Sequence, residues 1–133
     1  MEANQYQELA ARTLVDRPDI EIPDREMMLV WEALGLAGEA GEVANHVKKG
    51  VFHQHGIDIE KLKNEIGDTL WYAAALCTTL GLDLSEIMQA NIKKLEVRYP
   101  NGFTAEASKR RVDVNGVPLR QSDGDQGRKP KNK

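Results

Sequence analysis

The chain has little of several residue types that would tie it to particular classes of protein. Its single cysteine, Cys77, excludes an intramolecular disulfide and suits a reducing compartment. No stretch approaches the roughly 18 consecutive apolar residues of a membrane-spanning helix. The polar start MEANQYQELA also lacks the apolar centre of a signal peptide. We therefore expect a soluble cytoplasmic protein with no membrane partner, whose 133 residues are enough for one domain that folds without disulfides.

Positive charge is also scarce over most of the chain. Residues 1–108 contain 10 Lys and Arg against 18 Asp and Glu, whereas residues 109–133 contain 8 against 3. We do not expect a nucleic-acid partner for an acidic body, and any polyanionic ligand would need metal ions or a local cluster of cations. The change in charge divides the sequence into a domain, 1–108, and a C-terminal extension, 109–133, whose basic end we expect to be solvated.

Four segments carry apolar residues at helical spacing. They extend over about 3–15, from an N-cap at Asp24 to Gly50, from about Asp58 to Gly81, and from Ser85 to about Arg98. Short connections between four helices predict an all-α fold, an antiparallel four-helix-type bundle. No internal repeat is visible.

The sequence after the fourth segment changes character. In RVDVNGVPLR, the pair Asn115-Gly116 lies between two short alternating runs, which is a strong local signal for a β-hairpin. Pro118 restricts the second run to a sheet edge. We therefore expect either a small C-terminal β-hairpin or an irregular arm.

The second segment contains an unusual run, GLAGEAGEV, in which Gly35, Gly38 and Gly41 recur three residues apart. Each glycine inside a helix costs about 1 kcal/mol relative to alanine. Where side chains are absent, a neighbouring helix can approach closely or a bulky anion can reach the acids between the glycines. The alternative is ordinary packing of small residues, with Glu39 and Glu42 extending into solvent.

Acidic residues three apart share one helical face and can converge on one metal ion. Chance nearly accounts for the five such pairs in the chain, but Glu39/Glu42 and Glu65/Asp68 differ in context. Both lie mid-helix among apolar residues, each with a glycine directly before its second acid. Clustered carboxylates there need cations, and oxygen ligands favour Mg²⁺, with Mn²⁺ as a substitute. The 22 residues between the pairs allow the two helices to return side by side.

The fourth segment carries polar residues suited to phosphate. Asn91, Lys94 and Arg98 follow i, i+3, i+7 and share a face, although a solvated basic stripe would show the same spacing. Lys48 and Lys49 end the second segment, where they either bind phosphate or complement the helix dipole.

The aromatic residues near the acids allow two interpretations. Tyr72 follows Asp68 by one helical turn, so it either contacts a sugar or base or packs in the core. We assign Trp31 and Trp71 to core packing.

In combination, these parts resemble the MazG-like, all-α nucleoside triphosphate pyrophosphohydrolases. The resemblance covers about residues 6–103 and rests on GLAGEAGEVANHVKKG, EIGDTLWYAAAL and NIKKLEVRYPNGF, in that order. It implies a homodimer or homotetramer that hydrolyses a nucleoside triphosphate to the monophosphate and pyrophosphate. It also implies Mg²⁺ ligands at Glu39, Glu42, Glu65 and Asp68 and substrate contacts from Asn91, Lys94, Arg98 and, as a weaker transfer, Tyr72.

That chemistry needs alignment and charge neutralisation more than a protein nucleophile. We expect water to attack the α-phosphorus and one glutamate, Glu39 or Glu42, to accept its proton.

Two rival classes are open at this stage. A carboxylate-bridged di-iron bundle needs Glu-x-x-His pairs, and neither acidic pair contains histidine. A non-enzymatic helical module that binds a protein or a nucleotide explains the amphipathic helices, but not the mid-helix acids beside glycines.

Overall fold

The computed structural model describes residues 1–14 and 25–115, whose regular structure is all helical. The helices are α1 (Ala3–Ala11), α2 (Arg25–Phe52), α3 (Ile59–Leu80), α4 (Leu84–Arg98), α5 (Ala105–Arg110) and α6 (Val112–Asn115). The described residues fall into two compact units, which divide after residue 88. The all-α prediction is thus confirmed for the described residues. The four-helix arrangement stays a prediction, because α4 spans both units.

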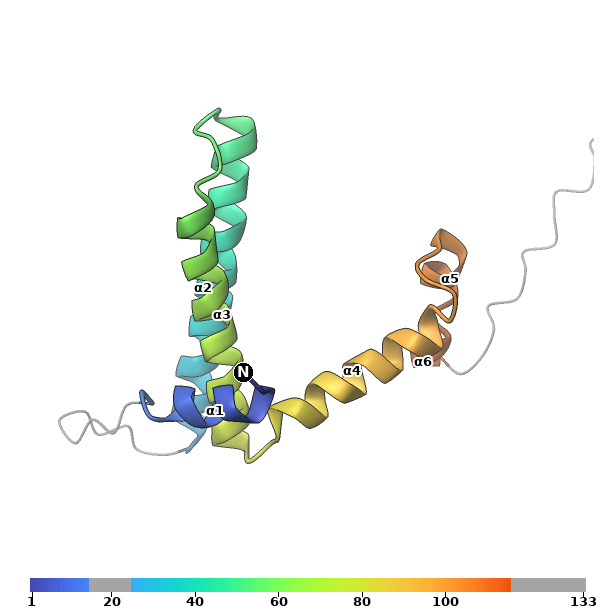
Figure 1. Ribbon diagram of the computed structural model, residues 1–133, viewed down its shortest axis with the longest axis horizontal. Coiled ribbons are helices and arrows are strands. Elements are labelled where there is room, and N and C mark those ends of the chain that lie inside the picture. Colours follow the sequence, from blue (N-terminus) through green and yellow to red (C-terminus); the bar gives the residue numbers. More distant parts are fainter. Residues whose placement is uncertain (15–24, 116–133) are drawn as a thin grey trace, which may run out of the picture. The chain divides into compact units, whose positions relative to one another are not determined.

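Helices α2 and α3 form an antiparallel hairpin and lie side by side along their lengths (Figure 1). Their contacts run in opposite directions along the sequence. Gly35 of α2 faces Tyr72 of α3. Glu32, three residues before Gly35, accepts a hydrogen bond from Thr79, which comes seven residues after Tyr72. The hairpin therefore places the middle of α2 opposite the middle of α3.

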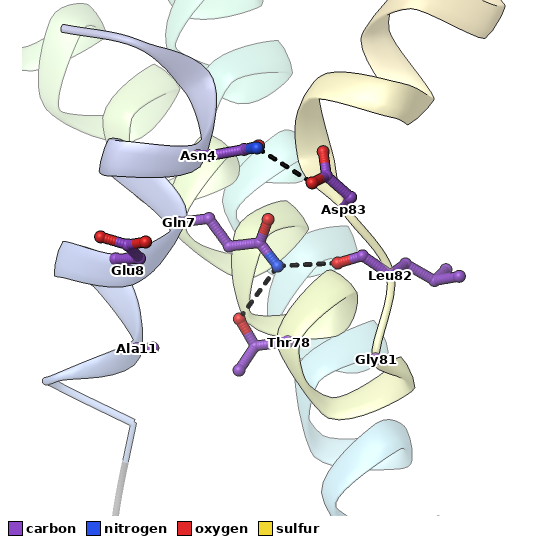
Figure 2. Close-up of a pocket in the computed structure, with 8 residues that line it drawn as sticks. All are labelled: Asn4, Gln7, Glu8, Ala11, Thr78, Gly81, Leu82 and Asp83. Carbon is purple, nitrogen blue, oxygen red and sulfur yellow. Dashed lines mark hydrogen bonds between the residues drawn. The ribbon is translucent and has the colours of Figure 1, made fainter.

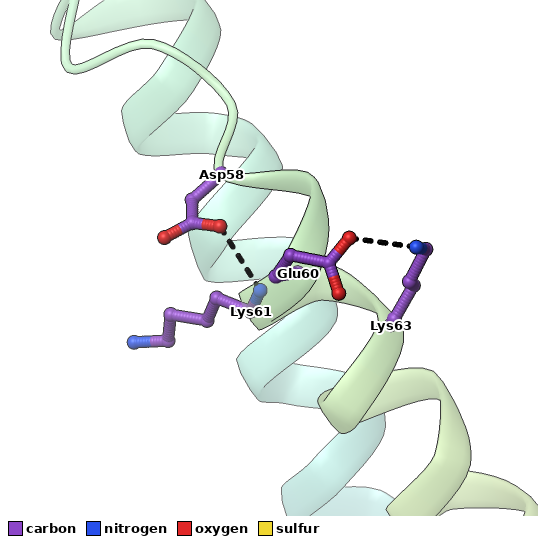
Figure 3. A network of polar contacts seen from close by, with 4 residues as sticks. All are labelled: Asp58, Glu60, Lys61 and Lys63. Atoms are coloured by element: carbon purple, nitrogen blue, oxygen red, sulfur yellow. Dashed lines mark hydrogen bonds and ion pairs between the residues drawn. The ribbon is translucent and has the colours of Figure 1, made fainter.

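Both ends of α3 were predicted correctly from local chemistry. The Asp58 carboxylate accepts a hydrogen bond from the Lys61 backbone N–H at 3.1 Å, which caps the first turn (Figure 3). On the same turn Lys63 and Glu60 form an exposed ion pair at 2.7 Å, which contributes little to stability (Figure 3). Gly81 ends the helix in the left-handed conformation, with φ 70°.

The ends of α2 differ from the prediction or lie outside the description. Gly50 does not stop the helix, which continues to Phe52. A Cβ at Gly50 would lie 2.7 Å from Ile57 Cγ1 and 2.9 Å from the Gly56 carbonyl oxygen, so glycine is needed there for the returning loop. The predicted N-cap, Asp24, lies outside the described residues.

Helix α1 is held against the turn between α3 and α4 by side-chain amides (Figure 2). The Gln7 Nε2 group donates to the Leu82 carbonyl at 2.8 Å and to Thr78 Oγ1 at 3.4 Å, and Asn4 Nδ2 donates to Asp83 at 2.9 Å. These side chains line a pocket of ≈ 400 Å³. The network accounts for the polar lining of this pocket without any ligand.

The same amides cap the start of α4. The backbone N–H of Leu84 donates to Gln7 Oε1 at 2.9 Å, and that of Ser85 donates to Asn4 Oδ1 at 3.1 Å. The Asp83 carboxylate accepts hydrogen bonds from the Ser85 hydroxyl and from the Glu86 backbone N–H. These bonds, most of all the one from Ser85, lower the pKa of Asp83. N–H groups that a helix cannot satisfy internally thus find partners, and α4 begins one residue before the predicted Ser85.

An aromatic cluster joins the first two long helices. Trp31, Trp71 and Tyr72 meet edge to face, with ring centroids 4.9–6.2 Å apart. The Trp71 Nε1 group also donates to Thr13 Oγ1 at 2.8 Å, which ties the end of α1 to this cluster. Trp71 is half-buried in this cluster, whereas Trp31 is 38% exposed, so the predicted place of Trp31 in the core was wrong.

The buried interior is small. Among the described residues, the buried apolar side chains are Ala10, Ala74, Ala75 and Cys77. Glu32 is fully buried as well; its Oε1 accepts from the Thr79 hydroxyl at 2.6 Å, while its Oε2 has no partner there. None of the described helices is both long enough and apolar enough to cross a membrane.

The predicted β-hairpin was wrong in its first half, and its second half lies outside the described residues. Val112–Asn115 form the short helix α6 instead of a strand. Arg111 adopts a left-handed conformation, with φ 46°, and reverses the chain between α5 and α6. An isolated two-stranded ribbon is only marginally stable in water. The helical turn instead places Asp113 against Arg98 of α4.

The glycines of α2 provide a matched test of the hairpin contact. A Cβ at Gly35 would lie 2.1 Å from the Tyr72 ring, so we expect Gly35→Ala to lower the free energy of unfolding by about 1–3 kcal/mol. Gly38 has nothing within 4 Å of an added Cβ, and Gly38→Ala should raise it by up to about 1 kcal/mol. Urea unfolding measures both, and equal effects would contradict the contact.

Candidate metal-binding site

The α2–α3 hairpin brings acids from both predicted pairs together. One carboxylate oxygen from each of Glu39, Glu65 and Asp68 lies within 4.8 Å of the others. Glu39 and Glu65 are half-buried, whereas Asp68 is exposed. The three side chains thus form one group, the acidic cluster, at the junction of two helices.

Glu42 lies outside this close group. It is exposed, one helical turn after Glu39 on α2. It is nevertheless near enough to act on Glu39, whose pKa is raised first by burial and then by the charges of Asp68, Glu65 and Glu42. All four predicted acids therefore share one electrostatic environment, in which negative charge accumulates.

The donor set of the acidic cluster fits a hard divalent cation. All its ligand atoms are carboxylate oxygens, the type that Mg²⁺ and Mn²⁺ prefer. Two oxygens bound to one Mg²⁺ lie between about 3.0 and 4.2 Å apart, inside the 4.8 Å limit that the three oxygens of the cluster satisfy. A cation there would also offset the mutual repulsion of the carboxylates.

The glycines beside the acids leave open space. At Gly38, Gly41 and Gly67 an added Cβ would meet nothing within 4 Å. Gly35 differs, because the Tyr72 ring occupies the position of its missing side chain. The run GLAGEAGEV therefore combines both predicted uses of glycine: one allows close helix contact, and the others leave room near the acids.

Tyr6 of α1 also lies beside the acidic cluster, a position that sequence reasoning missed. Its hydroxyl donates a long hydrogen bond, 3.5 Å, to the Gly67 carbonyl. Burial and then the charge of Asp68 raise the pKa of Tyr6. No motif links residue 6 to this site, because only the crossing of α1 over α3 brings the ring there.

The other predicted residues of the first unit lie in different settings. Tyr72 is half-buried in the aromatic cluster, which favours its packing role. Lys48 and Lys49 are exposed near the end of α2. His46 accepts a hydrogen bond from the Asp58 backbone N–H at 3.0 Å, and so holds the α2–α3 loop.

The three predicted phosphate-binding residues of α4 belong to the second unit. Asn91 and Lys94 are exposed. Arg98 is half-buried and paired with Asp113 of α6, a partner that sequence reasoning also missed. The charge of Asp113 alone gave no signal, because Asp113 lies in a segment for which a hairpin was expected.

Comparison with known proteins gives two relationships. The sequence pattern of the MazG nucleotide pyrophosphohydrolase domain matches residues 32–103, more than half of the chain. The Gene 37 protein of Mycobacterium phage L5 is 40% identical over 78 residues, which make up 56% of this chain and 68% of the phage protein. That name states no activity. No solved structure matches the chain.

The acidic cluster predicts a specific effect of divalent ions on stability. We expect Mg²⁺ to raise the melting temperature, since an ion at 100 times its dissociation constant adds about 2.7 kcal/mol. Glu65→Gln should raise the melting temperature of the metal-free protein, because one repelling charge is lost, and should remove most of the Mg²⁺ effect. Differential scanning fluorimetry with and without chelator measures both.

Glu60→Gln is the matched control, since Glu60 lies on the same helix but is exposed and pairs with Lys63. It should leave the Mg²⁺ response unchanged. A wild-type melting temperature that does not move at millimolar Mg²⁺ would argue against a shared site.

Proposed function

The chain belongs to the MazG nucleotide pyrophosphohydrolase family, and we propose that it is a Mg²⁺-dependent enzyme. It hydrolyses a nucleoside or deoxynucleoside triphosphate to the monophosphate and pyrophosphate. The main support is the acidic cluster of Glu39, Glu65 and Asp68, formed by two helices beside open space. An ordinary solvated helix surface gives no reason to gather three carboxylates from two helices beside side-chain-free positions.

In this proposal Glu39, Glu42, Glu65 and Asp68 hold divalent ions. When bound, such ions would supply charge neutralisation at the triphosphate and Lewis-acid activation of water. Glu39 or Glu42, which lie one helical turn apart on α2, would accept the proton that the water loses on attacking the α-phosphorus. No serine, cysteine or histidine acts as nucleophile.

The cations of α4 supply the remaining contacts. Asn91, Lys94 and Arg98 bind the nucleotide and its phosphates, and the charges of Lys94 and Arg98 steady the departing pyrophosphate. This role rests on residue type and register along α4. Lys48 and Lys49 add exposed positive charge at the end of α2, and Tyr72 contacts the sugar.

We also propose that the protein acts as a homodimer or homotetramer. On α2 and α3, large apolar side chains stay exposed, among them Val30 (51%), Leu34 (68%) and Leu70 (55%). Monomeric proteins rarely leave such side chains uncovered in groups. An antiparallel four-helix-type bundle, completed by α4 or by a second copy, would cover them. We place the enzyme in the cytoplasm, where nucleoside triphosphates are found.

Product analysis tests the proposed reaction. Incubation with Mg²⁺ and a panel of ribo- and deoxynucleoside triphosphates should release the monophosphate and pyrophosphate in equal amounts. Glu39→Gln and Glu42→Gln should each lower kcat by about 10²- to 10⁴-fold, the usual contribution of a proton acceptor or ligand. Chromatography of nucleotides, with separate assays for pyrophosphate and orthophosphate, gives the measurement.

Glu60→Gln again serves as the control and should retain wild-type activity. Release of orthophosphate alone would contradict attack at the α-phosphorus. Activity that survives Glu42→Gln would remove that residue from the mechanism, and nucleotide binding without turnover would favour a non-enzymatic binding module.

A further inference from the structure

Arg98, in the last turn of α4, is held by a carboxylate from the C-terminal extension. Its Nε donates to Asp113 Oδ1 at 2.6 Å, and its Nη2 donates to Asp113 Oδ2, so the pair is bidentate. The Asp113 side chain is only 1% exposed and that of Arg98 16% exposed. An ion pair this enclosed orients both groups far more firmly than a surface pair does.

The chain between the two residues is arranged to bring Asp113 back to α4. Thr104 caps α5 by accepting from the Ala107 backbone N–H at 3.1 Å, and Arg111 then reverses the chain with φ 46°. Few non-glycine residues adopt this conformation. On the other side, the guanidinium carbon lies 5.8 Å from the centroid of the Tyr99 ring.

The geometry of the pair decides which edge of Arg98 remains for a ligand. A guanidinium has five N–H groups, and Asp113 takes those of the Nε–Nη2 edge. Both Nη1 hydrogens and the second Nη2 hydrogen point away from that carboxylate. One Nη1 hydrogen and this Nη2 hydrogen form the end edge of the fork, which matches two oxygens of a phosphate.

We propose that Asp113 is a positioning residue that fixes Arg98 so that its Nη1–Nη2 edge binds a phosphate of the triphosphate. This inference rests on the proposed function. The positioning residue lies in the C-terminal extension, after residue 103, where the family match ends. The negative charge of Asp113 offsets the positive charge of Arg98. Asp113 therefore helps by orienting the Arg98 guanidinium and not by strengthening its attraction for the anion.

Both groups stay charged at neutral pH. The hydrogen bonds to Arg98 hold the pKa of Asp113 below its usual range, and those to Asp113, followed by Tyr99, raise the pKa of Arg98. Asp113→Asn therefore removes the ion pair with Arg98. It does not imitate a protonated Asp113, because Asp113 stays ionised near neutral pH.

The test combines single and double variants with two readouts. Asp113→Asn should lower kcat/KM by about 10- to 100-fold, the usual cost of removing a group that orients a ligand-binding side chain. Asp113→Glu, which keeps the charge, should recover part of that loss. Arg98→Lys should lose as much as Arg98→Ala, because an ammonium lacks the fork. In the Arg98→Ala background, Asp113→Asn should have no further effect.

Calorimetric binding of pyrophosphate in the presence of Mg²⁺ gives a second readout that needs no turnover. Pyrophosphate binding should weaken in the same variants, and in the same order, as kcat/KM falls. Asp83→Asn is the matched control for stability, since Asp83 also accepts several hydrogen bonds but lies outside the site. It should lower the melting temperature while both kinetics and pyrophosphate binding stay at wild-type values.

Three outcomes would overturn the inference. Tighter binding or faster turnover in Asp113→Asn would show that Asp113 blocks Arg98. A lower melting temperature with unchanged kinetics and binding would show a purely structural pair, and additive losses in the double variant would show that Asp113 does not act through Arg98. A wild-type protein that binds pyrophosphate with the predicted variant order but hydrolyses no nucleotide would refute the proposed function alone.

Discussion

The close approach of α2 and α3 at Gly35 and Tyr72 is the contact on which the proposed site depends. The tyrosine ring fills the space where any other residue at position 35 would carry a side chain. Glu39 lies one helical turn after Gly35, and Asp68 lies one turn before Tyr72. Because the helices are antiparallel, stepping one turn from this contact along each of them reaches the same place. The packing contact and the acidic cluster are therefore neighbouring turns of one interface.

In this arrangement the residues that serve the proposed chemistry lower the stability of the fold. Three carboxylates with oxygens within 4.8 Å repel one another, and the side chains that surround them contribute few buried contacts. Glycines at positions 38, 41 and 67 lower helix propensity further without gaining a neighbour. Such costs are common where a protein keeps a site open for a ligand. Bound cations and a partner subunit, both proposed here, would offset them.

The C-terminal extension is held to the end of α4 by a buried carboxylate that pairs with a cation. A carboxylate that is almost fully buried needs a cation, and Arg98 is the cation that the chain provides. The pair requires a left-handed residue and a short helix in a segment whose Asn-Gly dipeptide favours a hairpin. Tertiary contact overrides a local signal here, as it does at Gly50.

Much of the fold could be predicted because its causes are local. Apolar spacing located four helices, Asp58 and Gly81 marked both ends of α3, and the two acidic pairs identified candidate ligands before any coordinates were known. These features depend on residues within a few positions of one another. The three motifs and their order also sufficed to indicate the family.

Only the tertiary structure decided which distant groups meet. Tyr6 lies beside Asp68, Glu32 is buried against Thr79, and Asp113 binds Arg98, yet each pair is separated by many positions in the sequence. The continuation of α2 through Gly50 likewise depends on the loop that folds back against it. The sequence by itself determined where helices form and which acids could act together, since backbone hydrogen bonding and side-chain period are local. Helix packing determined which of those groups share an electrostatic environment, because that depends on distances through space.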